Sequence, residues 1–136
     1  MANEAVLRVE TLPPINFTVG NGSGIEKGTL LKLVDPMTAS GGNIASGQAF
    51  AGISAVEKIA NDGVSKLACY TDGIFDITAS SGGTITTGQI VSMSGANFVK
   101  TATEAEIAAG GAVGKALETT LASDATEVVR VFVGHI

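Results

Sequence analysis

The sequence has one cysteine, one histidine, one tyrosine and no tryptophan among its 136 residues. Cys69 has no partner for an intrachain disulfide, and its apolar neighbours predict a small, buried side chain. The chain has no run of about 18 apolar residues, and its N-terminus lacks the pattern of a secretory signal. We therefore expect a soluble protein that is made in the cytoplasm and has no membrane partner.

Positive charge is also scarce. Eight Lys and Arg residues stand against 13 Asp and Glu residues, which gives a net charge of −5, and the basic residues are scattered along the chain. Nucleic-acid binding needs a concentrated positive surface, so we expect no nucleic-acid partner. Charged residues make up only 15% of the chain, against the usual ~25%, which favours a surface partly covered by assembly.

The residue patterns that carry out catalysis are missing. His135 is the only histidine, so nucleophilic triads and zinc sites lack partners for it. The Gly-rich segment 22–29 resembles a phosphate loop, but its lysine precedes the glycine and no helical pattern follows. Asp72 and Asp76 could form a carboxylate pair, but a turn cap and an edge carboxylate are the simpler interpretation. We predict a non-enzyme with no metal and no cofactor.

The 18 glycines and a hydrophobic fraction of 45% favour short strands joined by turns. A hairpin lies at the centre of the chain, with strands over 49–59 and 64–71. Residues 61–63, Asn-Asp-Gly, tolerate the positive φ that such a reversal needs. A turn at residues 72–73 then leads into a strand that reaches Ile77.

The remaining segments alternate in the same way. Residues 36–47 are predicted to form a surface loop that Met37 and Ile44 hold down. Thr103 and Glu106 can form a capping box, so one short helix is expected near residues 103–110. Further strands are predicted within residues 15–19, 25–34, 84–93, 98–101, 112–118 and 127–133. Asp35-Pro36 is predicted to end the second of these strands.

One pattern occurs twice. Residues 25–33 and 85–93 both read Ile, two polar residues, Gly, polar, two apolar, polar, apolar. Gly114 with Glu118 repeats Gly52 with Glu57 at a similar offset. We interpret this as a strand–turn–strand repeat over about 25–57 and 85–118; chance similarity in a Gly- and Thr-rich chain is the alternative.

These observations predict a mainly β fold, a small compact β barrel or β-sandwich-like domain of the β-clip or β-tulip type. It would comprise an extended N-terminal arm over 1–14 and a single β-rich domain over 15–136. Pro13 and Pro14 end any regular pairing in the arm, because proline lacks the N–H group. The arm either folds back as an edge strand of its own domain or lies on a partner subunit.

The chain resembles a known family, the capsid cement or decoration proteins of tailed phages, some members of which carry a RecA/RadA-like recombinase label. The Gly-Ile-Phe-Asp-Ile element at 73–77 is the most distinctive match. The other matching segments are Ile15–Val19, Gly24–Leu31, Phe50–Ile53, Ile85–Val91, Val113–Leu117 and the terminal Val-Arg-Val strand.

The resemblance implies a structural virion protein on the outer surface of an expanded icosahedral shell. It implies a homotrimer whose partner is the major capsid protein, made in the host cytoplasm and stabilising contacts between capsid subunits. A small-ligand-binding β barrel and a recombinase-like nucleotide- or DNA-binding protein are the alternatives. Deleting residues 2–14 is expected to weaken capsid binding and leave the core folded. The residues expected to contact the capsid or a neighbouring subunit are Val6, Leu7, Leu12, Pro13, Ile15 and Phe17.

Overall fold

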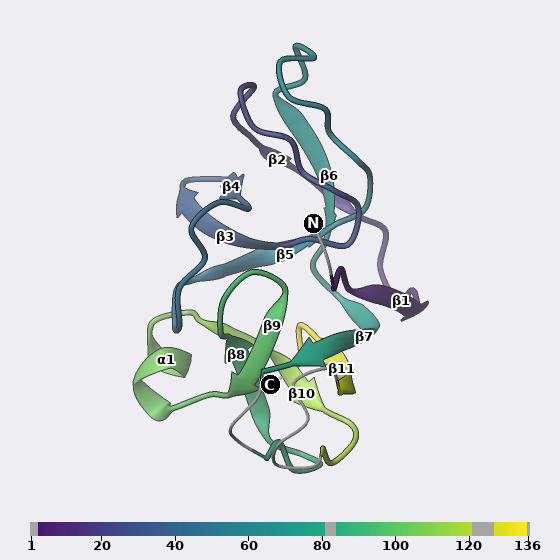
Figure 1. Cartoon of the computed structure of the whole chain (residues 1–136), viewed down its shortest axis with the longest axis vertical. Coiled ribbons are helices and arrows are strands. Elements are labelled where there is room, and N and C mark those ends of the chain that lie inside the picture. The colour runs from purple at the N-terminus through teal and green to yellow at the C-terminus, as the bar shows by residue number, and fades with distance from the viewer. Residues whose placement is uncertain (1–2, 81–83, 121–126, 136) are drawn as a thin grey trace.

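The structure is a computed structural model that describes residues 3–80, 84–120 and 127–135. Two closed five-stranded β barrels lie one above the other along the long axis (Figure 1). The mainly β, barrel-like fold predicted from the sequence is confirmed. The sequence did not reveal that the chain closes two barrels in place of one.

The first barrel is built from the N-terminal half of the chain. Its interior is filled by eight buried side chains, among them Phe17, Leu31 and Cys69. The strands run around the barrel in the order β2-β4-β3-β5-β6. Their bounds are β2 Ile15–Thr18, β3 Leu30–Asp35, β4 Thr38–Ser40, β5 Phe50–Ser54 and β6 Lys66–Tyr70.

The second barrel follows after a two-residue link. Its strands run in the order β7-β9-β8-β10-β11, and β1 (Val6–Val9) pairs along the outside of β7. Its core cluster takes in Leu30 and Ile53 of the first barrel, so the two barrels share apolar packing. The bounds are β7 Gly73–Ala79, β8 Ile90–Met93, β9 Phe98–Thr101, β10 Ala112–Ala116 and β11 Val128–Val133.

The two barrels have the same topology. In each, the first and third strands in chain order pair in parallel, β2 with β4 and β7 with β9, and the other neighbours pair antiparallel. Gly52 lies opposite Leu31 in the first barrel, as Gly114 lies opposite Val91 in the second. The strands inside 25–57 and 85–118 thus occupy equivalent places. The domain boundaries stay predictions.

The predicted central hairpin needs a correction. β5 ends at Ser54 and β6 begins at Lys66, so the strands predicted over 49–59 and 64–71 are both too long. The chain leaves the barrel at residue 55, where the Ser54 hydroxyl donates to the carbonyl of Val56. Beyond this point only a single bridge forms, between Ile25 and Lys58. Residues 55–65 therefore form a long excursion above the first barrel.

The loop predicted over 36–47 is also wrong in part. Residues 38–40 form β4, which pairs with β3 on one side and with β2 on the other. Ile44 packs against the second-barrel core, as expected of a residue that holds the segment down. Met37 does not, because its side chain is exposed. A three-residue strand gives too short an alternation for a sequence pattern to detect.

The predicted helix is confirmed as α1, Glu104–Ala108. Thr103 caps it: the Thr103 hydroxyl accepts from the backbone N–H of Glu106, and the Glu106 carboxylate accepts from the N–H of Thr103. The Glu106 carboxylate also accepts two hydrogen bonds of 2.7 Å from the Lys100 ammonium group on β9. This side chain therefore fixes the short helix to the second barrel.

These contacts lower the pKa of Glu106 to about 2, mainly through the hydrogen bonds from Lys100. A carboxyl group whose pKa is depressed by folding stabilises the fold above its unfolded pKa of about 4.5 and loses that contribution as the pH falls toward 2. We expect Glu106→Gln to flatten the acid side of the stability curve between pH 5 and 2, about the window of those two values. Urea titrations at several pH values would measure this, with Glu104→Gln as control. Parallel curves for Glu106→Gln and the wild type would contradict the prediction.

Candidate docking surfaces

Several large apolar side chains remain exposed, each between 37% and 67% of its surface. Isolated exposed apolar residues are ordinary, but clusters of them mark contact surfaces. They form four groups: Val6, Val9, Leu12 and Ile15 on the N-terminal segment; Leu33, Val34 and Met37 on the β3–β4 hairpin; Val56, Ile59 and Val64 in the 55–65 excursion; Leu117 and Val128 on the second barrel.

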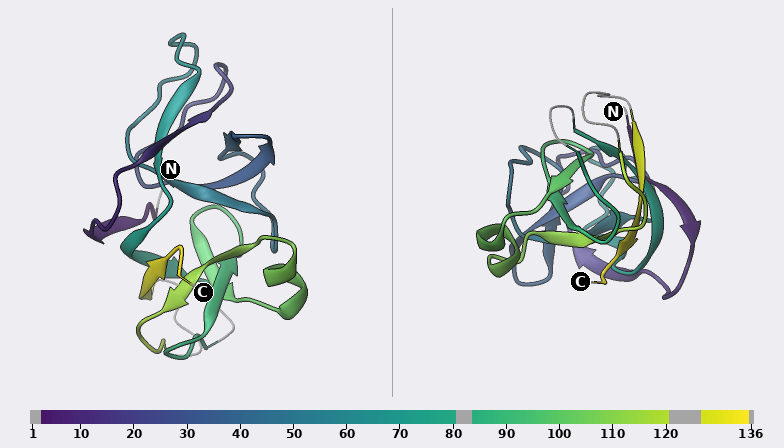
Figure 2. Two further views of the ribbon diagram at one scale, coloured as in Figure 1. Left: turned by 180° about the vertical axis from the view of Figure 1, so that it is seen from behind. Right: turned by 90° about the horizontal axis from the view of Figure 1, so that it is seen from below.

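The N-terminal segment lies on the protein's own barrels. β1 pairs with β7, and the purple strand runs along the outer side of the molecule (Figure 2). The segment beyond it is held by the hydroxyl of Tyr70, which donates to Glu10, and by the hydroxyl of Thr11, which donates to Asp72. In the isolated chain this segment is therefore an edge strand, the first of the two alternatives for the arm.

The structure separates the residues that were expected to contact the capsid. Val6, Leu12, Pro13 and Ile15 are exposed. Leu7 packs against the core of the second barrel. Phe17 lies inside the first barrel with 6% of its surface exposed. Phe17 therefore has no free surface for a partner.

The arm cannot be removed without cost to the fold. Ala5 is buried, and its N–H donates to the carbonyl of Gly28. Leu7 covers part of the second-barrel core. Deleting residues 2–14 would uncover apolar surface and the edge of β7. We therefore expect that deletion to destabilise the core as well. Point substitutions test the arm more cleanly.

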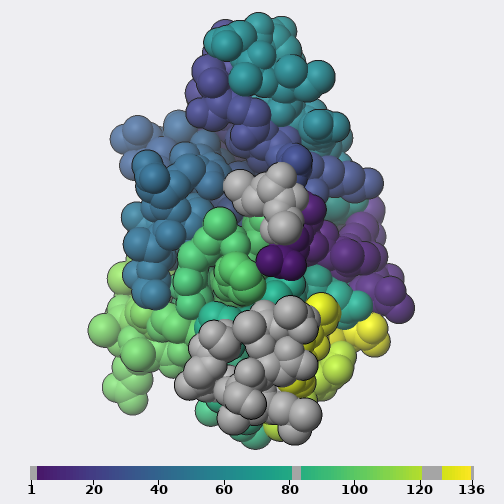
Figure 3. All heavy atoms as spheres, in the orientation of Figure 1, coloured from purple at the N-terminus to yellow at the C-terminus, as the bar shows by residue number. Residues whose placement is uncertain are grey.

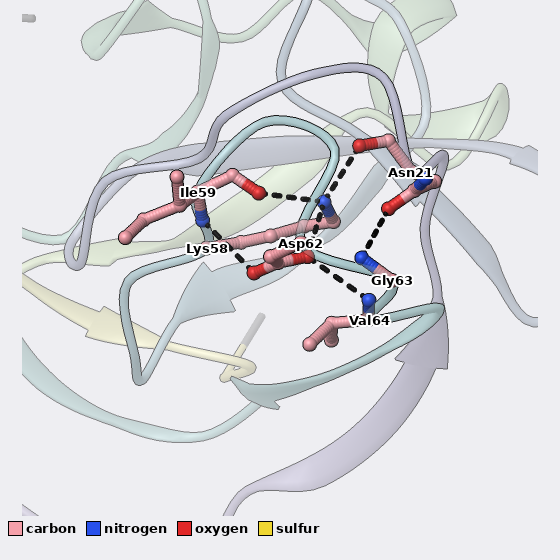
Figure 4. Close-up of polar contacts among 6 residues, drawn as sticks. All are labelled: Asn21, Lys58, Ile59, Asp62, Gly63 and Val64. Atoms are coloured by element: carbon pink, nitrogen blue, oxygen red, sulfur yellow. Dashed lines mark hydrogen bonds and ion pairs between the residues drawn. The ribbon is translucent and has the colours of Figure 1, made fainter.

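A buried lysine organises the 55–65 excursion (Figure 4). The side chain of Lys58 is fully buried, and its ammonium group donates to the carbonyls of Asn21 and Ile59 and to Asp62 Oδ1, at 2.9, 3.1 and 3.1 Å. Asp62 also accepts from the N–H groups of Ile59 and Val64. These hydrogen bonds lower the pKa of Asp62, the one from Val64 most strongly.

The lysine joins two loops that are far apart in sequence. The Asn21 side-chain oxygen accepts from the N–H of Gly63 at 2.7 Å, and the Asn21 carbonyl accepts from the N–H of Asn61. The loop between β2 and β3 is thus fixed to the loop between β5 and β6. A buried charge of this kind requires full hydrogen bonding, which the three acceptors supply. The exposed Ile59 therefore lies in a loop that these hydrogen bonds hold in place.

A hollow of about 380 Å³ lies beside this cluster, lined mainly by Ile25, Glu26, Glu57, Lys58 and Ile59. Its lining residues belong to the segments that connect the strands of the first barrel. The Lys58 ammonium group is already bonded to three oxygen atoms. The hollow therefore presents no free cation to an anionic ligand through this lysine.

The predicted carboxylates both contact nitrogen atoms of other side chains. Asp76 lies on β7 between two neighbouring strands, where Arg130 Nε contacts its Oδ1 at 2.9 Å and Arg8 Nε its Oδ2 at 3.6 Å. Asp72 lies beside His135, whose Nε2 is 3.1 Å from its Oδ2. Asp76 is not the edge carboxylate that was expected, because β1 covers that side of β7. Each carboxylate therefore has a nitrogen partner, in place of the second carboxylate that paired acid–base chemistry would need.

Other features indicate structure rather than chemistry. Cys69 is buried as expected, and burial raises the pKa of its thiol to about 11. The glycine of the phosphate-loop-like segment, Gly28, donates its N–H to Ser54, and a strand follows it. Within residues 3–80, 84–120 and 127–135, no three metal-binding side chains gather. No helix in the same ranges has the length and hydropathy that a membrane span needs.

The sequence reasoning missed two of these features. Lys58 has no local signal of burial beyond its spacing of four residues from Asp62. The exposed apolar group of the β3–β4 hairpin (Leu33, Val34 and Met37) could not be recognised from the sequence, because these residues flank a turn, where the alternation of apolar and polar residues is interrupted. Asp35-Pro36 did correctly mark the end of the strand before it.

The sequence was compared with family models and with curated proteins. The sequence model of the phage cement protein family matches residues 9–132. A search of curated proteins found no match.

Proposed function

This chain belongs to the phage cement protein family, and from that premise we propose that it binds the outer face of an expanded icosahedral shell and stabilises contacts between major capsid subunits. The family is structural and non-enzymatic, and membership implies a place in the virion capsid. The match over residues 9–132 carries the proposal, because it spans both barrels.

The barrels support a scaffold role over ligand binding. Small barrels that bind ligands leave an interior cavity, whereas side chains fill both interiors here. The recombinase alternative is opposed by the strand that follows the phosphate-loop-like segment and by the charge of −5. Both alternatives lack a supporting observation among the described residues.

Binding of this kind stabilises the shell by mass action. A ligand that binds only the expanded state shifts the equilibrium toward that state by RT ln(1 + [L]/Kd). A rigid binder loses less conformational entropy on association than a flexible one. Two barrels with a shared core and a cross-linked loop pair suit that requirement.

We further propose that the exposed apolar residues of the N-terminal segment contact the shell or a neighbouring subunit, and that the cement unit is a homotrimer. The residues are Val6, Leu12, Pro13 and Ile15, with Leu7 supporting them from beneath. Space-filling views place the described part of this purple segment at the junction of the two halves (Figure 3). A partner docked here would touch both barrels at once.

We expect the triple variant Val6→Thr, Leu12→Ser, Ile15→Thr to bind expanded shells about 10- to 100-fold more weakly, because each apolar side chain contributes roughly 1 kcal/mol when it becomes buried. The three positions are exposed, so the unfolding midpoint should stay close to that of the wild type. Val56→Thr is the control, because Val56 is similarly exposed but lies in the segment 55–65 between β5 and β6. Equal binding by the triple variant would remove the arm from the interface.

Co-sedimentation with expanded and unexpanded shells of the protein's own virus tests the main proposal. Saturable binding to expanded shells alone is expected, with a copy number that fits three-fold positions. Sedimentation velocity of the free protein tests the trimer separately. Absence of binding to either shell form would overturn the cement role for this chain.

A further inference from the structure

Two turns occupy equivalent places in the two barrels. Residues 34–37, which include the last two residues of β3 and lead into β4, correspond to residues 94–97 between β8 and β9. The strand pairs that flank the two segments, here called the β3–β4 turn and the β8–β9 turn, correspond as well. β4 then pairs in parallel with β2, as β9 does with β7. The last residue of each turn is left-handed, with φ 52° at Met37 and 64° at Asn97.

The turn of the second barrel is covered by the first barrel. Asn97 is fully buried, and its Oδ1 accepts from the N–H of Leu30 at 3.1 Å. Met93, just before the turn, is also fully buried. In Figure 1 the loop between β8 and β9 reaches up toward the first barrel. This turn is therefore an internal docking element.

The turn of the first barrel has no such cover in the chain. Leu33, the counterpart of Met93, is 41% exposed, and Met37, the counterpart of Asn97, is 54% exposed. Val34 stands where the second barrel has Ser94, and it too is exposed. Thus at two of the four equivalent positions, 34/94 and 37/97, the more buried turn carries the polar residue and the exposed turn the apolar one. Solvation alone would give the opposite distribution.

Methionine is also an unusual residue at this backbone position. Among described residues other than glycine, positive φ occurs at Met37 and at four asparagines. Asparagine tolerates the left-handed region, whereas an unbranched apolar side chain gains nothing there unless it makes contacts. More than half of the Met37 surface is exposed, so much of its side chain makes no contact within the chain. Such an outlier indicates a functional constraint.

A second copy of the chain is a poor occupant for this surface. The first-barrel residues that join the second-barrel core include Ile53, and the equivalent position on the second barrel is the exposed Lys115, since both lie opposite equivalent residues. A charged residue at the outer face of a terminal repeat is typical of a cap. A further copy stacked end to end would therefore meet a charged residue where the first barrel has Ile53.

We propose that Leu33, Val34 and Met37 form an apolar anchor that inserts into an apolar socket on the outer face of the major capsid protein. This rests on the proposed cement function, which supplies the partner. The anchor sits on a hairpin closed into a barrel, so little backbone ordering accompanies its insertion. Methionine, which is flexible and polarisable, suits a socket of irregular shape.

The variant Met37→Asn tests the anchor without risk to the fold, because it places in the turn the residue that the equivalent turn already has. We expect an unfolding midpoint equal to or above that of the wild type, and binding to expanded shells at least tenfold weaker in co-sedimentation. Val128→Thr, on the second barrel, removes an equally exposed apolar residue and should bind as the wild type does.

The outcomes separate the two proposals. If the wild type binds expanded shells and Met37→Asn binds equally well, the anchor is overturned and the cement role stands. If the wild type does not bind, the cement role fails first. If Met37→Asn binds shells normally but changes the sedimentation coefficient of the free protein, the occupant is a second copy, which also overturns the proposal.

Discussion

Replacing Gly114 by alanine is expected to destabilise the protein by at least about 3 kcal/mol, a large share of the roughly 5–15 kcal/mol by which a native domain is ordinarily stable. An added Cβ would lie 2.3 Å from the carbonyl oxygen of Phe132 and 2.8 Å from its carbonyl carbon. Both are backbone atoms of the neighbouring strand β11, so no side-chain movement can relieve the clash. The barrel would have to open at the β10–β11 pair.

Chemical denaturation measures this effect, with Gly20→Ala as the matched control. No heavy atom lies within 4 Å of a Cβ at Gly20, so this change should move stability by less than about 0.5 kcal/mol. Gly52 is the counterpart in the first barrel, where the Cβ would lie 2.7 Å from the carbonyl oxygen of Tyr70. A stable Gly114→Ala variant, within about 1 kcal/mol of the wild type, would show that the two strands can separate.

The second large effect is expected at Lys58. Lys58→Met keeps the length of the buried stem and removes the ammonium group, which takes one donor each from the carbonyls of Asn21 and Ile59; the Asn21 carbonyl keeps the N–H of Asn61. Breaking a buried ion pair costs about 3–5 kcal/mol, and Asp62 is 27% exposed and can be rehydrated. We therefore expect the free energy of unfolding to fall by about 2–4 kcal/mol, somewhat less than for a fully buried pair.

Thermal and urea unfolding of Lys58→Met would be compared with Lys66→Met. Lys66 is exposed and makes one side-chain hydrogen bond, to Thr18, so its removal should cost less than about 0.5 kcal/mol. Hydrogen exchange adds a local readout, because the amides of Asn61 and Gly63 depend on the loop junction. Unchanged protection of these two amides in Lys58→Met would refute the role of Lys58 in joining the two loops.

Local sequence signals predicted the local structure. The capping box of Thr103 and Glu106 specified the helix, because both hydrogen bonds lie within four residues. Alternation and the Asp35-Pro36 stop located β3. The repeat of Gly28 and Gly88 marked equivalent turns, where each N–H donates across to the same strand position, Ser54 and Ala116.

Features that depend on distant residues could not be found in this way. The closure of each barrel rests on a short parallel pairing, such as the one between Thr18 and Thr38, which leaves no periodic trace. The burial of Lys58 depends on a carbonyl 37 residues earlier, at Asn21. Likewise, Phe17 was expected at an interface, whereas closure of the first barrel buries it.

The path of the chain also sets the order of events during synthesis. β7 is flanked by β1 near the N-terminus and by β11 near the C-terminus, so the second barrel needs both ends of the chain. The first barrel can close as soon as residue 70 leaves the ribosome, since domains form as units from the N-terminus. Leu30 and Ile53 then face water until β8 to β10 arrive. A nascent chain stalled between residues 70 and 112 would therefore expose this apolar surface of the first barrel. A chaperone that binds apolar segments would recognise the chain during this interval.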